Sequence, residues 1–260
     1  MTVTFSPFRA RVVAVTSGKG GVGKTNVVAG LATAFAKVGQ RVVVLDANFG
    51  LANLDVLLGL SPRHTLEQVL KGEKMMEEVV LEAPVAGGAS IRVIPTSSGV
   101  HELSQLDPAS ELRLTQSLQR VCDDADWLFI DTAAGIHDAV LKMLAASQEV
   151  ILVSTPEPTS LLDAYAMLKV LHLREPDKAV HLVINNAQSR EEANEAADQL
   201  RAAAQHFLGK DLGVLGLVPS DRHLLQAVRQ QRSVVEIYPG SPSGMAIRAM
   251  AESLAEHVGV

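Results

Sequence analysis

The chain has 260 residues, of which 47 % are hydrophobic and 20 % charged, so a disordered chain is excluded and a large buried core is expected. Its 29 acidic and 23 basic residues give a formal net charge of −6, and we expect no nucleic-acid partner because non-specific binding needs clustered Lys and Arg. No apolar run approaches the roughly 20 residues that cross a bilayer, and the first ten residues lack a signal peptide, which predicts a cytoplasmic protein.

Seven short apolar runs predict the strands of one sheet. Each run is nearly continuous in apolar residues, which is typical of strands buried on both faces of a mostly parallel sheet. Helix-like segments separate the runs, so we predict a three-layer, doubly wound α/β fold. A short N-terminal segment, residues 1–10, precedes a single domain, residues 11–260, and residues 83–90 are expected to form only a flexible loop. The runs are 11–17, 41–46, 91–96, 127–132, 150–155, 180–185 and 214–219.

Local signals set several helix boundaries. "VGQ" after Lys37 and "EPDK" after Arg174 are typical of helix ends, and "DPASELRL" from Asp107 predicts a capped helix start with Pro in the first turn. The single cysteine, Cys122, excludes an internal disulfide and is expected to be half-buried on a helix. In doubly wound sheets ligands bind at the carboxyl ends of the strands, so functional residues should follow the apolar runs.

The first run is followed by "SGKGGVGKT", residues 17–25. It fits the pattern G-x-x-x-x-G-K-[ST] between a strand and a helix, as a phosphate loop requires. Glycines let successive N–H groups turn inward around an anion, Lys24 is expected to reach the β- and γ-phosphates, and Thr25 to offer its hydroxyl to Mg²⁺. A glycine-rich turn without a ligand is the alternative. The predicted nucleotide-binding residues here are Gly18, Lys19, Gly20, Gly21, Val22, Gly23, Lys24, Thr25 and Asn26.

An ordinary phosphate loop does not need the second lysine, Lys19. Such a cation could reach the nucleotide of a partner subunit, as an arginine finger does, or could be a solvated surface lysine. "KGGVGKT" with this extra lysine resembles the deviant phosphate loop of the MinD/ParA family of ATPases. The resemblance implies the P-loop NTPase fold, ATP or ADP as ligand, Lys19 as the signature lysine, and a homodimer that closes face to face around two ATP molecules.

Asp46-Ala47-Asn48 ends the second run, at the position of the family's switch I. The resemblance implies a D-x-D pattern in which the first carboxylate supports the metal site and the second orients the attacking water. Asp46 matches, but Asn48 departs, because an amide can hold a water but cannot accept a proton. We therefore predict ATP binding with hydrolysis slowed on the order of 10²–10⁴-fold, with Lys19, Lys24, Asp46 and Asn48 as the catalytic set. An ordinary loop asparagine is the alternative.

"FIDTAAGI", from residue 129, resembles the family's switch II. Asp131 is expected to join Thr25 and Asp46 around Mg²⁺ through a water, and Gly135 to provide a hinge whose N–H senses the γ-phosphate. A helix cap is the alternative for Asp131. The predicted switch II consists of Asp131, Thr132, Ala133, Ala134 and Gly135.

Two late runs end in candidate base contacts. Asn185 carries an amide with a donor and an acceptor for an adenine edge, and the resemblance implies that it binds the base. Pro219 and the backbone as far as Asp221 are expected to wall the other side of the ring. Without the phosphate loop, Asn185 would be interpreted as a plain turn residue.

"PEPTSLLDAYAMLK", residues 156–169, resembles the flagellar-number regulators of the FlhG/FleN branch more than cell-division MinD. The resemblance, from about residue 10 to 255, implies control of flagellar number or placement through a transcription activator or an SRP-type GTPase. Glu157 and Asp163 are candidates for dimer or effector contacts, or are ordinary acids at a helix start. The N-terminus has no clear "DQAxxLR" motif, which counts against direct activation of such a GTPase.

The last helix is expected to pack on the core rather than to anchor the chain in a membrane. Its apolar stripe faces inward and its polar face is not basic, although peripheral association with the inner face of the membrane or the cell pole stays open. The stripe is Ile247, Met250, Leu254 and Val258, and the polar face Arg248, Glu252, Glu256 and His257.

Three alternatives belong to other functional classes. A ParA-like, DNA-associated partition ATPase would use Arg222, Arg229 and Arg232, but the acidic chain favours a solvated helix face or a protein-docking patch. A MinD-like division-site ATPase shares the same motifs. A metabolic relative, kinase-like or amidotransferase, would need a small-molecule pocket for which no sequence signal is present.

Overall fold

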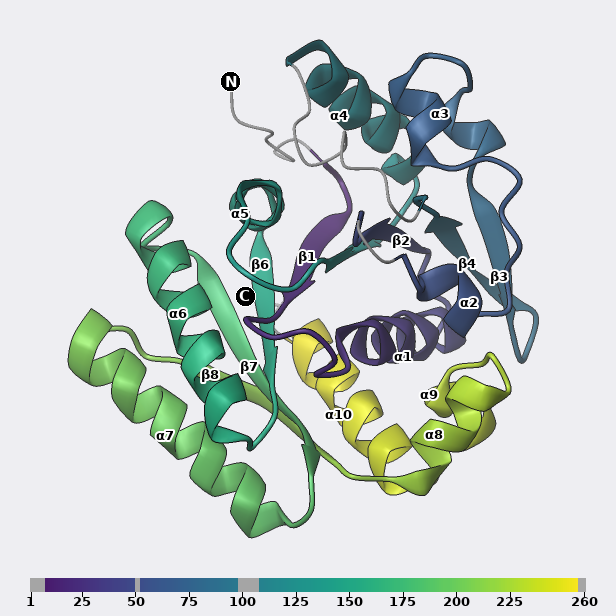
Figure 1. Ribbon diagram of the computed structural model, residues 1–260. Helices are drawn as coiled ribbons and strands as arrows, with labels where there is room; N and C mark the ends of the chain where they lie inside the picture. Colours follow the sequence, from purple (N-terminus) through teal and green to yellow (C-terminus); the bar gives the residue numbers. More distant parts are fainter. Residues whose placement is uncertain (1–7, 50–51, 98–107, 257–260) are drawn as a thin grey trace.

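The computed structural model describes residues 8–49, 52–97 and 108–256 (Figure 1). Its eight strands form one sheet in the order β3-β4-β2-β5-β1-β6-β7-β8. Every neighbouring pair is parallel except β3 and β4, which confirms the mostly parallel sheet. The strands are β1 (Arg11–Thr16), β2 (Val42–Ala47), β3 (Leu81–Val85), β4 (Ala89–Ile94), β5 (Trp127–Thr132), β6 (Glu149–Ser154), β7 (Ala179–Ala187) and β8 (Gly213–Pro219).

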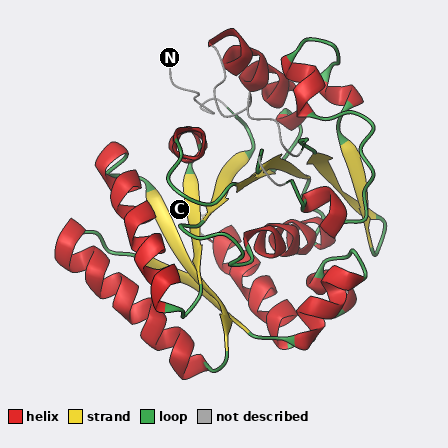
Figure 2. Ribbon diagram, in the orientation of Figure 1, coloured by secondary structure: helices red, strands yellow, loops and turns green. Residues whose placement is uncertain are grey.

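Helices cover both faces of the sheet, which confirms the three layers (Figures 1 and 2). One face packs against α1 (Lys24–Lys37), α2 (Leu54–Leu57), α8 (Arg222–Arg229), α9 (Val234–Ile237) and α10 (Pro242–Glu256). The other face packs against α3 (Leu66–Leu70), the 3₁₀ turn Met76–Glu78, α4 (Pro108–Cys122), α5 (Asp138–Ala146), α6 (Pro158–Arg174) and α7 (Arg190–Leu208). No helix among the described residues is long and apolar enough to span a membrane.

The continuous apolar runs follow from burial on both sides. In β1, Val12 and Ala14 enter one core and Val13 and Val15 enter the other. All four side chains are fully buried, so neither face tolerates a polar position. Period-2 geometry thus explains why these strands do not alternate in sequence.

The prediction of a loop at residues 83–90 was wrong, because these residues belong to a hairpin of β3 and β4. The turn uses Gly87 and Gly88 at φ 98° and 85°, values that L side chains rarely adopt. Ala83 is buried and Pro84 exposed, so β3 alternates as a half-covered edge strand, where proline is tolerated. The strand was missed because its residues alternate, unlike the continuous apolar runs, and because proline usually indicates a loop.

The predicted ends of α1 at Lys37 and of α6 at Arg174 are confirmed, as is the start of α4 at Pro108, whereas Asp107 lies outside the described residues. Cys122 is fully rather than half buried, and this burial raises the pKa of its thiol to about 12. The inward stripe of α10 is confirmed by buried Ile247, Met250 and Leu254, whereas His257 and Val258 lie outside the described residues.

Candidate nucleotide and magnesium site

The candidate site lies at the carboxyl ends of three adjacent central strands. The sheet order puts β2, β5 and β1 side by side, and the loop that follows β1 leads into α1 (Figure 1). Asp46 on β2 and Asp131 on β5 are register partners. The topology therefore brings together a loop and two carboxylates that are distant in the sequence.

The loop presents backbone N–H groups at the start of α1. Gly21 and Gly23 adopt left-handed φ values of 79° and 93°, which glycine accepts without strain. Gly23 is the N-cap residue, and no side chain caps the helix. The first turn contains no acidic residue, so its N–H groups and the positive end of the helix dipole are suited to an anion.

Two glycines of the loop are in close contact with other elements. A Cβ on Gly18 would lie 2.1 Å from the carbonyl of Asp163 on α6, and a Cβ on Gly23 would lie 2.3 Å from Nδ2 of Asn185. The same nitrogen donates to the carbonyl of Val22 at 2.8 Å. Asn185 thus supports the loop through its donor side, and Asp163 contacts it through the backbone of α6.

Lys24 is buried beneath this loop, with 8 % of the residue exposed. Its Nζ donates to Ser17 Oγ at 2.9 Å, and that hydroxyl donates to the carbonyl of Lys19 at 2.7 Å. Burial lowers the pKa of Lys24, while the nearby Asp131 raises it. Ser17 was not among the predicted site residues, and its position directly before the first glycine was the available signal.

Asp46 and Asp131 are almost fully buried. Asp46 accepts hydrogen bonds from the N–H groups of Asn48 at 3.0 Å and of Asn53 and Leu54 at 3.2 Å each. Burial and the neighbouring Asp131 nevertheless raise the pKa of Asp46 to about 7.

Burial also raises the pKa of Asp131 to about 6, against the opposing effects of a hydrogen bond from Thr25 and of the Lys24 charge. Its Oδ1 is buried and has no hydrogen-bond partner within the described part of the chain. Oxygen ligands and excess negative charge are what Mg²⁺ requires, so Thr25, Asp46 and Asp131 fit this cation.

Both predicted switches begin beside these carboxylates. Asn48 is half-exposed, and its N–H donates to Oδ1 of Asp46 at 3.0 Å. In switch II, Gly135 has φ 88°, and its N–H donates to the carbonyl of Ser17 at 2.9 Å. Thr132 donates through Oγ1 to the carbonyl of Val15 at 3.0 Å. The predicted switch II is therefore hydrogen-bonded to the end of β1 and to the start of the phosphate loop.

Lys19 lies on the outer rim of the loop, with 39 % of its side chain exposed. Its Nζ is 2.7 Å from Oε2 of Glu157 and 3.2 Å from Oγ1 of Thr159 at the start of α6. The structure brings the predicted residues Lys19 and Glu157 together. Thr159 was missed, because its proximity depends on how α6 packs against the loop.

Pro219 ends β8, and Asp221 lies two residues beyond it. Oδ1 of Asp221 accepts from the N–H of His223 at 2.9 Å, while Oδ2 accepts from the N–H and hydroxyl of Ser243 at 3.0 and 2.7 Å. Burial alone would raise the pKa of Asp221, but these hydrogen bonds hold it well below its usual value. The carboxylate thus caps α8 and binds the first turn of α10, a role that the helical run after Asp221 could have signalled.

A phosphate loop that opens a helix, together with carboxylates at the ends of two neighbouring parallel strands, defines a P-loop nucleoside triphosphatase. The ParA family model, described as "NUBPL iron-transfer P-loop NTPase", matches residues 9–255. The chain belongs to the ParA/MinD family of ATP-binding P-loop NTPases.

Two relatives are similar to the chain in sequence, and one solved structure is similar to it in fold. Antiactivator FleN of Pseudomonas aeruginosa is 41 % identical over 94 % of this chain and 86 % of its own length. The flagellum site-determining protein YlxH of Helicobacter pylori is 32 % identical over 93 % of this chain and 80 % of its own length. The septum site-determining protein MinD of Pyrococcus horikoshii, complexed with Mg-ADP, has a TM-score of 0.76 at 24 % identity and covers 96 % of this chain and 98 % of its own. The resemblance predicted from the loop and switch motifs is confirmed.

Proposed function

We propose that this chain is an ATP-dependent dimerisation switch that regulates flagellar number or placement through a protein partner. The names of two relatives, an antiactivator and a flagellum site-determining protein, support the output. The observation that carries the switch is the separation of the two loop lysines. Lys24 is buried and directed back toward Ser17, whereas Lys19 is on the exposed rim, where a second subunit could reach it.

The phosphate loop, residues 18–26, binds the phosphates of ATP or ADP through its N–H groups and Lys24. Thr25, Asp46 and Asp131 hold Mg²⁺, which offsets negative charge on the phosphates when bound. Asn185 and Pro219 flank the base, and Asp221 acts there through its backbone because its carboxylate is engaged by His223 and Ser243.

Dimerisation exchanges the partners of Lys19. In the single chain this ammonium is paired with Glu157, and in the dimer it contacts the nucleotide of the other subunit. Glu157 and Asp163, which lie beside the loop, are then available for contacts with the second subunit or an effector. The exchange of one anionic partner for another keeps the charge of Lys19 compensated in both states.

Hydrolysis of ATP and water to ADP and phosphate returns the dimer to monomers. Asn48 orients water through its amide but cannot remove a proton, so turnover is slow. Switch II, Asp131 to Gly135, responds to the γ-phosphate when the bond from the Gly135 N–H to Ser17 is exchanged for one to the nucleotide.

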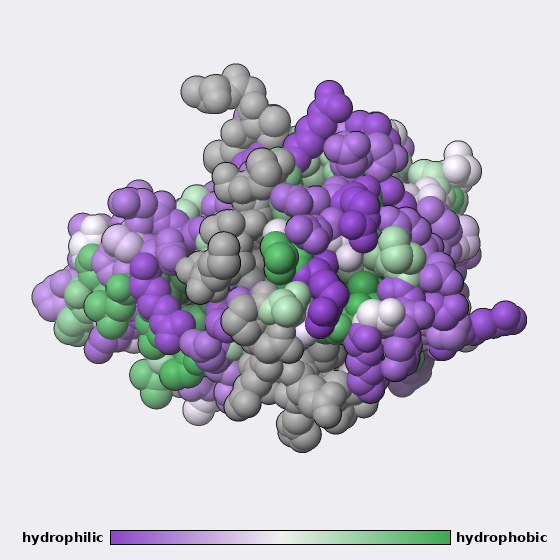
Figure 3. All heavy atoms as spheres, turned by 90° about the horizontal axis from the view of Figure 1, so that it is seen from above, coloured by the Kyte–Doolittle hydropathy of each residue, from purple (hydrophilic) through white to green (hydrophobic). Residues whose placement is uncertain are grey.

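The flagellar partner, a transcription activator or an SRP-type GTPase, docks on α6 and α7, which come after both switch segments in the chain. Two exposed apolar residues support this surface. Leu173 on α6 has an exposed fraction of 72 %, and Phe207 on α7 has one of 69 %. In the view from above, hydrophobic residues gather on the side of the molecule formed by these two helices (Figure 3). Exposed apolar groups of this kind mark protein interaction sites.

Light-scattering mass in Mg-ATP and in Mg-ADP tests the switch. We expect a dimer in ATP and a monomer in ADP for this chain and for the control Lys37→Ala, an exposed position at the end of α1. Lys19→Ala should bind ATP and stay monomeric. A Lys19→Ala protein that dimerises like the parent chain, or a parent chain that binds ATP and stays monomeric, would contradict the proposal.

A further inference from the structure

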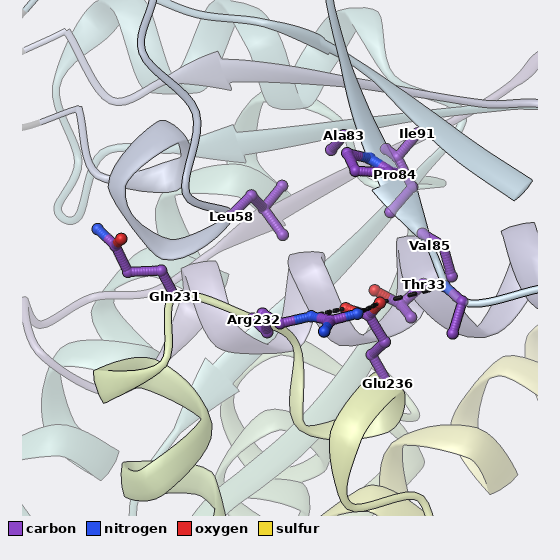
Figure 4. Close-up of a pocket in the computed structure, with 10 residues that line it drawn as sticks. Thr33, Leu58, Ala83, Pro84, Val85, Ile91, Gln231, Arg232 and Glu236 are labelled. Atoms are coloured by element: carbon purple, nitrogen blue, oxygen red, sulfur yellow. Dashed lines mark hydrogen bonds and ion pairs between the residues drawn. The ribbon is translucent and has the colours of Figure 1, made fainter. Parts of the chain in front are cut away.

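A pocket of about 430 Å³ lies between the β3–β4 hairpin, α1 and the loop that joins α8 to α9 (Figure 4). We call it the hairpin pocket, and it is lined by Leu58, Ala83, Val85, Ile91, Arg232 and Glu236. Its volume is within the range of roughly 300–1,000 Å³ found for ligand sites. Thr33, which also lines it, is nine residues beyond Lys24 on α1, about 14 Å along the helix axis. The hairpin pocket is therefore separate from the nucleotide site.

One side of the hairpin pocket is aliphatic. Leu58 follows α2 and points toward the hairpin, from which Val85 of β3 and Ile91 of β4 face it (Figure 4). Leu58 is half-buried, so this wall is open to an incoming group. Burial of a Leu or Ile side chain from a partner against this wall would favour binding, because it removes apolar surface from water.

The other side of the hairpin pocket offers hydrogen-bond donors. Glu236, with 5 % of its side chain exposed, accepts from Arg232 Nε at 3.0 Å, from Arg232 Nη2, and from the N–H of Ala86 at 3.1 Å. Both carboxylate oxygens are thus engaged. Arg232 is half-exposed, and its guanidinium has five N–H donors, of which these bonds use two. The remaining donors suit a carboxylate on a ligand.

The neighbouring surface of α8 is basic and apolar. Arg222 and Arg229 are exposed and form no ion pair within the described part of the chain. Leu225, which is 66 % exposed, is three residues from one and four from the other, so all three share one helix face. Arg232 of the hairpin pocket follows three residues after Arg229. This local positive charge contrasts with the net charge of −6 for the whole chain.

The edge of the sheet next to the hairpin pocket is unsuited to pairing with another strand. β3 pairs with β4, and its exposed Pro84 has no N–H to offer a further strand. An extended peptide that adds to the sheet is thus disfavoured. The features that remain for recognition are the pocket, the arginines and Leu225, which suit side chains on one face of a helix.

We propose that the hairpin pocket and the outer face of α8 form a docking site for an acidic amphipathic helix of a partner protein. One aliphatic side chain of that helix enters the hairpin pocket, and its carboxylates pair with Arg232, Arg229 and Arg222. The site goes beyond the proposed function and shares no residue with the nucleotide site. DNA phosphates would meet the arginines but leave the aliphatic wall uncovered, so charge and shape together favour the acidic helix.

A peptide selection tests this docking site. Random 16-residue peptides displayed on phage are selected on the full chain in Mg-ADP, after removal of peptides that bind the double variant Leu58→Asp/Arg229→Glu. We expect enriched sequences with Leu or Ile between Asp and Glu residues at helical spacing. A synthetic copy of an enriched peptide should bind at least about tenfold more weakly to each single variant, because a buried anchor and its charged neighbours dominate such interfaces.

Control variants on the other face of the sheet, Leu112→Gln on α4 and Lys169→Glu on α6, should leave the affinity for the peptide unchanged. Methyl NMR signals of Val85 and Ile91 should shift on binding, which locates the peptide independently of any variant. Thermal unfolding verifies that Leu58→Asp is folded, and Arg229→Glu is expected to fold because Arg229 is exposed and unpaired within the described chain.

Four outcomes would overturn the proposal. They are enriched peptides without acidic residues, no enrichment at all, affinity unaffected by both variants, or methyl shifts elsewhere in the molecule. Binding of a random 30-base-pair duplex that depends on Arg229 but not on Leu58 would identify a nucleic-acid surface instead. A dimer in Mg-ADP that Leu58→Asp abolishes would show that a second copy of the chain occupies the site.

Discussion

Asn48 lies two residues beyond Asp46, and in the proposed mechanism its amide holds the attacking water. Asn48→Asp should raise the single-turnover rate of ATP hydrolysis by on the order of 10²-fold, because the new side chain can hold the attacking water and accept its proton. ATP affinity should change little, since the phosphates are bound by the loop. Phosphate release measures the rate. Equal rates for the two proteins would mean that another group positions the water.

Gly18 is a site where a single methyl group has a large effect. A Cβ there would be 2.1 Å from the carbonyl of Asp163, so Gly18→Ala must separate α6 from the phosphate loop. We expect a loss of about 1–3 kcal/mol in the free energy of unfolding, together with weaker nucleotide binding. Gly20→Ala is the control, because the space around Gly20 is open. Urea unfolding of both variants gives the comparison, and equal stabilities would contradict the assigned contact.

The motif residues could be predicted from sequence because their positions follow from connectivity. Lys24 opens the first helix, and Asp46 and Asp131 end apolar runs, so parallel strands necessarily bring them to one edge. The contact of Lys19 with Glu157 and Thr159 could not be derived in this way. It depends on where α6 packs, and nothing within either segment encodes that distance.

Between elements, Asp221 joins the starts of α8 and α10 through one carboxylate. Asp221→Ala should cost about 1–2 kcal/mol in the free energy of unfolding at pH 7, as the loss of a helix cap does. Thermal and urea unfolding measure this loss. The exposed Asp177→Ala is the control, and we expect it to be nearly neutral.

The same carboxylate makes stability depend on pH. Its folded pKa is below the ordinary value of 3.8, so its contribution is complete above that value and is lost as the pH falls below it. Urea unfolding between pH 5 and 3 should therefore show a smaller loss of stability for Asp221→Asn than for the parent chain. Parallel losses would show that other carboxylates govern acid unfolding.

Strands with continuous apolar runs were recognisable from sequence, whereas β3 was not. Only Ala83 and Val85 of β3 are buried, and an edge strand half-covered by helices has the alternating composition of many loops. Its Pro84 adds a further loop signal, although an edge position removes the usual penalty. The other edge strand, β8, was predicted because its apolar run is continuous, so β3 was missed for its alternating composition and its proline rather than for its edge position.

For the molecule as a whole, Mg-nucleotide binding should stabilise the fold. At a ligand concentration 100 times Kd, Mg-ADP should add about 2.7 kcal/mol, which corresponds to roughly 5–10 °C in Tm for a chain of this size. Removal of Mg²⁺ with a chelator should reduce the gain. The measurement is differential scanning fluorimetry with ADP, with and without Mg²⁺.

Asp131→Asn distinguishes the metal effect from phosphate binding alone. The unliganded variant should be at least as stable as the parent chain, because it removes a buried carboxylate whose pKa burial raises to about 6. Its additional gain from Mg²⁺ should largely disappear, whereas ADP alone should stabilise both proteins similarly. An undiminished magnesium gain would place the cation elsewhere.

The central place of β1 also affects how the chain is made. Val15 accepts a hydrogen bond from Thr132, 117 residues later, and β6, on the other side of β1, comes later still. At about 5–20 residues per second, a ribosome needs roughly 6–23 s to add that length. During this interval the first strand, though already synthesised, has neither of its neighbours. Nascent chains should therefore expose the apolar residues of β1 until β5 and β6 emerge. During that time a chaperone can bind β1.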